Sequence, residues 1–171
     1  MPLVLNGTTG VQDNSGAFVA GTAVASTSGT SIDFTGIPSW AKRITVMFTG
    51  VSTNGTSSII VQAGSTSFTT SGYTGTLATT ISGATATSSL STGFQVAGSV
   101  AVASTLFGKC EICLLTGNTW AASAVVGRGN EARCDYMGGT IALSGVLDRV
   151  RITTVNGTDT FDAGSINILY E

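Results

Sequence analysis

The three cysteines have the spacing that comes closest to a metal or redox site in this chain. Cys110 and Cys113 are separated by two residues, as in zinc and thiol-exchange motifs, and Cys134 could supply a third thiolate. Residues Leu106 to Leu115, however, have the composition of a β-strand, in which positions three apart point to opposite faces. Thiols on opposite faces cannot close on one metal ion or one disulfide. We therefore expect three free thiols, with Cys110 packed as a small apolar side chain.

Two arginines near the C-terminus form a candidate anion site. Arg149 and Arg151 alternate with Val150 and Ile152, so both guanidinium groups lie on the same face of a predicted strand. Together they could hold a phosphate, a carboxylate or a sugar acid. The alternative is an Arg–Asp ladder that includes Asp148, on the outside of a sheet or across a subunit interface, and it needs no ligand. We favour this alternative.

A quarter of all charged residues lies in one short segment, Gly127 to Gly139. Its charged side chains are Arg128, Glu131, Arg133 and Asp135. We expect this segment to be a solvated loop or an interface patch, and its four charged residues are candidates for contact with a partner.

Composition excludes several classes of function. Histidine is absent, which removes the Ser-His-Asp and Cys-His arrangements and the usual general base. Asp159 and Asp162 have the setting of turn residues, and no carboxylate pair is marked out for acid–base chemistry. The net charge of −2, from 7 basic and 9 acidic residues, offers no basic surface for nucleic acid. Apolar runs are far shorter than a membrane span. We expect no enzyme activity, no cofactor, no nucleic-acid partner and no membrane insertion.

The elements that must position these residues are β-strands. Gly, Ser, Thr and Ala make up more than half of the chain, and stretches of strong helix formers are missing. Short alternating segments recur along the sequence and predict an all-β fold, an antiparallel β-sandwich of jelly-roll type. The expected strands are Ala23–Ser28, Ser31–Thr35, Lys42–Val51, Ser57–Ala63, Gly75–Ile81, Gly93–Ala97, Leu106–Leu115, Trp120–Val126, Gly138–Val146, Arg149–Val155 and Gly164–Tyr170.

Two Asn-Gly dipeptides separate pairs of these strands. Asn54-Gly55 lies between the third and fourth expected strands, and Asn156-Gly157 lies between the last two. Asn-Gly is the dipeptide that best supplies the positive φ angles of a type I′ turn. The sequence therefore predicts two β-hairpins.

The first twenty residues differ from the rest of the chain. Residues 1–20 contain turn signals with little alternation, and they predict an extended N-terminal arm that attaches to another surface or subunit. Residues 21–171 are expected to form one β-sandwich domain, because their length suits a single core.

Two stretches of the sequence resemble a domain that recurs in virion proteins of tailed bacteriophages. One is Gly21–Gly64, which contains GIPSWAKRITVMF from Gly36 to Phe48, and the other is the ending Leu147–Glu171. Together they cover roughly two fifths of the chain, and the segment Ser65–Gly139 does not carry the resemblance. The resemblance implies a tail-fibre or other virion appendage with a C-terminal β-sandwich, and it brings no catalytic motif.

The expected function is that of a non-enzymatic structural protein of a phage virion, assembled in the bacterial cytoplasm together with other virion proteins. Charge-poor sheet faces and open sheet edges favour a homotrimer. Within this class we favour a fibre or receptor-binding knob, whose further partner would be a host surface receptor. The alternative is a capsid decoration protein that stabilises the phage head. A second alternative, a glycan-binding module outside a virion, would need clustered exposed aromatic side chains that the sequence does not show.

Overall fold

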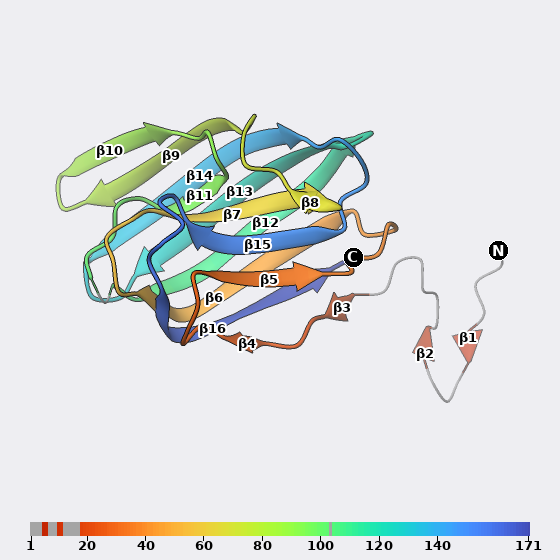
Figure 1. The fold of residues 1–171 in the computed structure, drawn as a ribbon, viewed down its shortest axis with the longest axis horizontal. Coiled ribbons are helices and arrows are strands. Elements are labelled where there is room, and N and C mark those ends of the chain that lie inside the picture. The colour runs from red at the N-terminus through yellow and green to blue at the C-terminus, as the bar shows by residue number, and fades with distance from the viewer. Residues whose placement is uncertain (1–4, 7–9, 12–17, 103) are drawn as a thin grey trace.

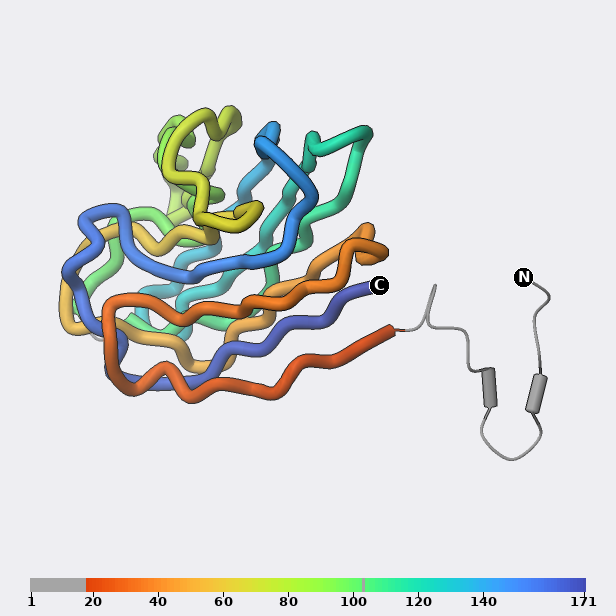
Figure 2. Tube along the Cα trace, turned by 45° about the vertical axis from the view of Figure 1, so that its right-hand side comes forward, coloured from red at the N-terminus to blue at the C-terminus, as the bar shows by residue number. Residues whose placement is uncertain are grey.

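The computed structural model describes residues 5–6, 10–11, 18–102 and 104–171, and every regular element in this part of the chain is a β-strand. All strands except two at the N-terminus form two antiparallel sheets that pack face to face, so the predicted β-sandwich is confirmed (Figures 1 and 2). The jelly-roll connectivity stays a prediction.

The larger sheet has nine strands. In spatial order they are β10 (Ala84–Ser89), β9 (Thr74–Ile81), β14 (Arg133–Ala142), β13 (Thr119–Arg128), β12 (Leu106–Thr116), β6 (Arg43–Thr53), β16 (Phe161–Tyr170) and β3 (Val19–Ala20), and β4 (Val24–Ala25) also pairs with β16.

The smaller sheet has five strands and lies in front of the larger one in Figure 1. Its order is β11 (Phe94–Ala97), β7 (Ile59–Ser65), β15 (Arg149–Thr154) and β5 (Ser31–Thr35), and the short β8 (Ser67–Phe68) pairs with β7. The remaining strands, β1 (Leu5–Asn6) and β2 (Gly10–Val11), pair with each other.

Alternation along the strands produces the core between the sheets. In β6 the side chains of Ile44, Val46 and Phe48 face inward and are buried, as the sequence predicts. Phe94 of β11 and Phe161 of β16 are the largest of the fully buried side chains. The opposite side chains of the same strands form the outer faces of the sandwich.

Both predicted hairpins are wrong, because each Asn-Gly segment joins strands of different sheets. β6 leads into β7, and β15 leads into β16, so each connection crosses from one sheet to the other. Neither Asn54 nor Asn156 has the positive φ that a type I′ turn requires.

Side-chain hydrogen bonds hold these two connections against each other at one end of the sandwich. The N–H of Thr160 donates to Asn54 Oδ1 at 2.9 Å, and the N–H of Ser57 donates to Asp159 Oδ2 at 2.9 Å. Asn156 Nδ2 donates to the other oxygen of Asp159 at 2.6 Å. The asparagines and Asp159 therefore fix a crossover between the sheets.

The boundary predicted at residue 20 falls at the edge of the large sheet. Val19 and Ala20 pair with Tyr170 and Leu169 of β16, and the N–H of Gly21 donates to the carbonyl of Ile168 at 2.7 Å. Most of the predicted arm, residues 1–4, 7–9 and 12–17, lies outside the described residues.

The expectation of a solvated loop over Gly127–Gly139 is wrong for most of that segment. β13 extends to Arg128 and β14 begins at Arg133, so only four residues connect them. The side chains of Arg128 and Asp135 are buried between the sheets, because each neutralises the other there. β14 also begins five residues before Gly138, the first residue of the expected strand.

Candidate self-association surface and charged clusters

The outer face of the large sheet is broad and poor in charge. Cross-strand registers place its side chains in rows, and the central row runs from Met47 of β6 through Lys109 and Val125 to Tyr136 and Ala78 of β9. The neighbouring rows consist mainly of Thr, Ser, Gly, Ala and Cys. Three of the exposed large apolar side chains of the described chain lie on this face: Phe107, Val125 and Tyr136, with Val125 54% exposed.

The charges in the central rows of this face and at one end of the sheet are paired on the same face. Lys109 Nζ lies 2.7 Å from Glu111 Oε1, two residues along β12. The hydrogen bond from Lys109 lowers the pKa of Glu111, which keeps the carboxylate ionised. At the end of the sheet, Arg43 pairs with Glu171. A partner surface that covers the central rows would therefore meet the Lys109–Glu111 pair and no lone charge there.

The edge strand β10 also has an open edge. All six of its residues are exposed, and none is charged or a proline. Natural sheets protect an open edge with lysine, proline, bulges or a covering segment, since an unprotected edge pairs readily with another chain. This edge and the outer face adjoin, because β10 pairs with β9.

The predicted charged cluster is a compact network that is buried at Arg128 and Asp135 and partly exposed at Arg133. Arg128 donates from Nε and Nη2 to the two carboxylate oxygens of Asp135 at 2.7 and 3.0 Å. Its Nη1 donates to the carbonyl of Ser99 at 2.8 Å and to Glu131 at 3.3 Å. Arg133 also pairs with Glu131, at 3.2 Å, so all four candidate residues are brought together. The two positive and two negative charges cancel within the network.

The second candidate cluster lies on the outer face of the small sheet. Arg149 and Arg151 share a face, as predicted, but each guanidinium already holds a carboxylate with two hydrogen bonds. Arg149 binds Asp148, and Arg151 binds Asp33 of β5. The hydrogen bond from Arg149 lowers the pKa of Asp148. The favoured Arg–Asp ladder is confirmed.

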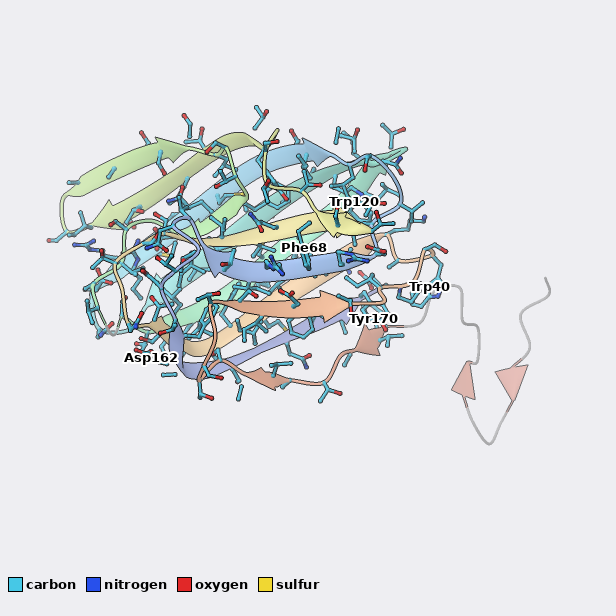
Figure 3. All side chains as sticks on the ribbon, in the orientation of Figure 1. Trp40, Phe68, Trp120, Asp162 and Tyr170 are labelled. Atoms are coloured by element: carbon cyan, nitrogen blue, oxygen red, sulfur yellow. The ribbon has the colours of Figure 1, made fainter. Side chains whose placement is uncertain are left out.

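An aromatic ring that was not among the predicted site residues packs on this ladder. Phe68 of β8 lies on the same outer face, and the guanidinium carbons of Arg151 and Arg149 are 4.1 and 5.7 Å from its ring centroid (Figure 3). The only sequence signal was the position of Phe68 after the tight turn that follows β7. Thr66 makes this turn with a φ of 62°, and glycine at position 64 lets β8 approach β7, because a Cβ there would lie 2.2 Å from the carbonyl oxygen of Ser67.

Next to this ladder is an open groove of about 300 Å³ in the outer face of the small sheet. Arg151 and the buried Gln62 line it together with hydroxyl side chains, among them Thr70 and Thr153. Gln62 donates from Nε2 to the carbonyl of Thr92 at 2.8 Å. Because the groove is in the outer face of the small sheet, it lies on the side of the sandwich opposite the charge-poor outer face of the large sheet.

The cysteines are placed as the sequence predicts. All three are free, Cys110 is buried in the core, and Cys113 lies half-buried on the opposite face of β12. Burial raises the pKa of Cys110, so this group stays a thiol at neutral pH.

We expect Cys110 to react with iodoacetamide only at urea concentrations that unfold the protein, because its thiol is buried and protonated. Cys113 and Cys134 lie half-buried on the outer face of the large sheet, so they should react without urea in protein diluted far enough to dissociate any assembly, and they serve as the comparison within the same molecule. Peptide mass spectrometry after timed labelling measures all three sites. Labelling of Cys110 in native buffer at the rate of Cys113 would contradict this assignment.

Neither a metal site nor a membrane helix is present in the described part of the chain. Among these residues, no three His, Cys, Asp or Glu side chains gather where they could hold a metal ion. No helix in the same part of the chain is long and apolar enough to cross a membrane. Comparisons with family models, curated proteins and solved structures found no match to this chain.

Proposed function

We propose that this chain is a non-enzymatic structural protein of a tailed-phage virion that assembles as a homotrimer. The observation that carries the proposal is the outer face of the large sheet, where Lys109 and Glu111 compensate each other and most other side chains are small or apolar. Removing such a surface from water costs less than burying an unpaired charge, because Lys109 and Glu111 keep each other as partners. The resemblance of Gly21–Gly64 and Leu147–Glu171 to phage virion domains supports the virion assignment.

The open edge of β10 supports a ring over a face-to-face dimer. A two-fold contact between two outer faces would leave β10 uncovered in both copies. In a closed ring, the outer face of one copy meets the β9–β10 hairpin of the next copy. Every subunit then has both its outer face and its β10 edge covered. Three subunits form the smallest ring of this kind.

The receptor-binding knob is the favoured form of the proposal. Assembly through the large sheet leaves the outer face of the small sheet free, and this face carries the groove beside Arg151. A groove with hydroxyl groups, an amide and a guanidinium suits contact with a polar surface.

Localisation of the protein on phage particles tests the proposal. Antibodies raised against the purified chain should label particles from cultures that express the gene, and electron microscopy of gold-labelled particles should place the label at the tail tip. Label over the head would contradict the receptor-binding knob and support the alternative, a capsid decoration protein. Particles that carry no label, in cultures that do contain the protein, would overturn the virion assignment.

A further inference from the structure

Two segments with the same sequence, Asn-Gly-Thr, lie in the two connections between the sheets, at one end of the sandwich (Figure 1). They are Asn54–Thr56, after β6, and Asn156–Thr158, after β15. An asparagine followed by glycine is prone to deamidation, because glycine has no side chain to obstruct attack of its backbone nitrogen on the asparagine amide. Both asparagines are exposed, and Gly157 is more exposed than Gly55. Sequence and exposure therefore give no reason for Asn54 to react first.

Hydrogen bonds hold every group of Asn156 and Gly157 that deamidation must move. The N–H of Gly157, which carries the attacking nitrogen, donates to the carbonyl of Thr154 at 3.0 Å. Asn156 Oδ1 accepts from the hydroxyl of Thr154 at 2.8 Å and from two backbone N–H groups at 3.1 and 3.3 Å. Its Nδ2, the leaving group, donates to Asp159 at 2.6 Å. Deamidation of Asn156 therefore requires several of these hydrogen bonds to break first.

The corresponding groups of Asn54 and Gly55 are held by fewer contacts. Within the described residues, no hydrogen bond uses the N–H of Gly55 or the Nδ2 of Asn54. Asn54 Oδ1 accepts one hydrogen bond, from the N–H of Thr160 at 2.9 Å. This donor stabilises the negative charge that develops on the oxygen when the amide carbon is attacked. The attacking nitrogen and the leaving amide are thus both available at Asn54.

The carboxylate of Asp159 lies against Gly55. A Cβ at position 55 would lie 2.0 Å from Asp159 Oδ2, so the carboxylate occupies the space beside this glycine. Its negative charge opposes removal of the proton from the nitrogen of Gly55. We therefore expect Asn54 to react more slowly in the folded protein than in the unfolded chain, but faster than the folded Asn156.

From these contacts we infer that Asn54 is a deamidation site of the folded protein and that Asn156 is protected. Hydroxide removes the proton from the nitrogen of Gly55, and this nitrogen attacks Cγ of Asn54. A bond forms between the nitrogen and Cγ, the bond between Cγ and Nδ2 breaks, and Nδ2 takes a proton from water and leaves as ammonia. Water then opens the succinimide ring at one of its two carbonyl groups, which leaves aspartate or isoaspartate at position 54.

Deamidation of Asn54 would loosen the crossover between the sheets. The N–H of Asn54 donates to the carbonyl of Thr160 at 3.0 Å, and Asn54 Oδ1 accepts from the N–H of the same residue. Both products place a new carboxylate in the crossover that already contains Asp159. Isoaspartate also adds one atom to the backbone between β6 and β7. We therefore expect the converted protein to unfold at a lower temperature than freshly purified protein.

Timed peptide mapping of the full chain tests the site. The protein is incubated in mildly alkaline buffer, once folded and once unfolded in urea, and mass spectrometry follows the conversion of amide to acid at each asparagine. The peptides also distinguish both sites from Asn6-Gly7, which lies partly outside the described residues. In urea, Asn54 and Asn156 should convert at similar rates, because the local sequences are identical.

In the folded protein, Asn54 should convert at least about tenfold faster than Asn156, which corresponds to about 1.4 kcal/mol in the activation free energy. Equal rates at the two sites in the folded protein would overturn the inference. Faster conversion of Asn156, or no conversion of Asn54 over a time in which urea allows it, would overturn it as well.

Two matched variants test the effect on the fold. Glutamine at either position keeps a side-chain amide, but its cyclisation needs a six-membered ring and is much slower. After the same incubation, the unfolding temperature should fall in the wild type and in Asn156→Gln, each compared with its own fresh sample, and should hold in Asn54→Gln. An equal fall in Asn54→Gln and the wild type would show that the loss does not come from Asn54.

Discussion

Replacement of Asp135 by Asn is expected to destabilise the fold by about 3–5 kcal/mol, because it breaks a fully buried ion pair and leaves Arg128 only the carboxylate of Glu131, 3.3 Å from its Nη1. Neither side chain of this pair has any exposed surface. The expected loss is a large part of the roughly 5–15 kcal/mol that stabilises an ordinary domain. Urea unfolding of Asp135→Asn and the wild type, at one fixed protein concentration, measures the difference.

The matched control for this variant is Asp33→Asn on the outside of the small sheet. Asp33 also binds an arginine through two hydrogen bonds, but about a third of each side chain is exposed. Solvent screens that pair, so we expect a change of about 0–1 kcal/mol. The double variant Arg128→Met with Asp135→Leu should recover most of the stability, since it removes both buried charges. Similar losses in the free energy of unfolding for Asp135→Asn and Asp33→Asn would show that the Arg128–Asp135 pair is not buried in solution.

The sequence predicted what depends on local alternation. The inward positions Ile44, Val46 and Phe48, the opposite faces of Cys110 and Cys113, and the common face of Arg149 and Arg151 all follow from a period of two residues. These features are the same whichever strands become neighbours.

Features that depend on pairing between distant strands could not be predicted in the same way. Asn54-Gly55 has the local signal of a hairpin, but β6 finds its partners in β12 and β16, far along the chain. Arg128 is a charged residue in a charged segment, and its burial follows only from the contacts with Asp135 and Ser99. The charge-poor outer face likewise appears only when β12, β13 and β14 are placed side by side.

Replacement of Val125 by Lys is expected to break the proposed assembly. Val125 lies in the central row of the outer face, between Lys109 and Tyr136. A new lysine there would place an unpaired positive charge beside Lys109 at every copy of the interface, and desolvating such a charge costs several kcal/mol. We expect assembly to weaken at least about a hundredfold, which corresponds to about 2.7 kcal/mol. Sedimentation equilibrium over a range of concentrations measures this change.

Val155→Lys is the control for this variant. Val155 is 51% exposed, close to the 54% of Val125, but it follows β15 of the small sheet at the rim of the groove. The same change of side chain there should leave the assembly unchanged. If Val155→Lys dissociates the protein and Val125→Lys does not, the interface lies on the small sheet instead of the large one.

The mass of the native protein in solution shows whether the chain associates through its charge-poor face. Light scattering on the peak from a size-exclusion column, at micromolar concentration and physiological salt, should give three times the 17.1 kDa mass of the chain. The mass should hold at high salt, because the outer face contributes apolar contacts and its charges are already paired. A mass of 17.1 kDa that persists at the highest concentration tested would contradict self-association through the charge-poor face.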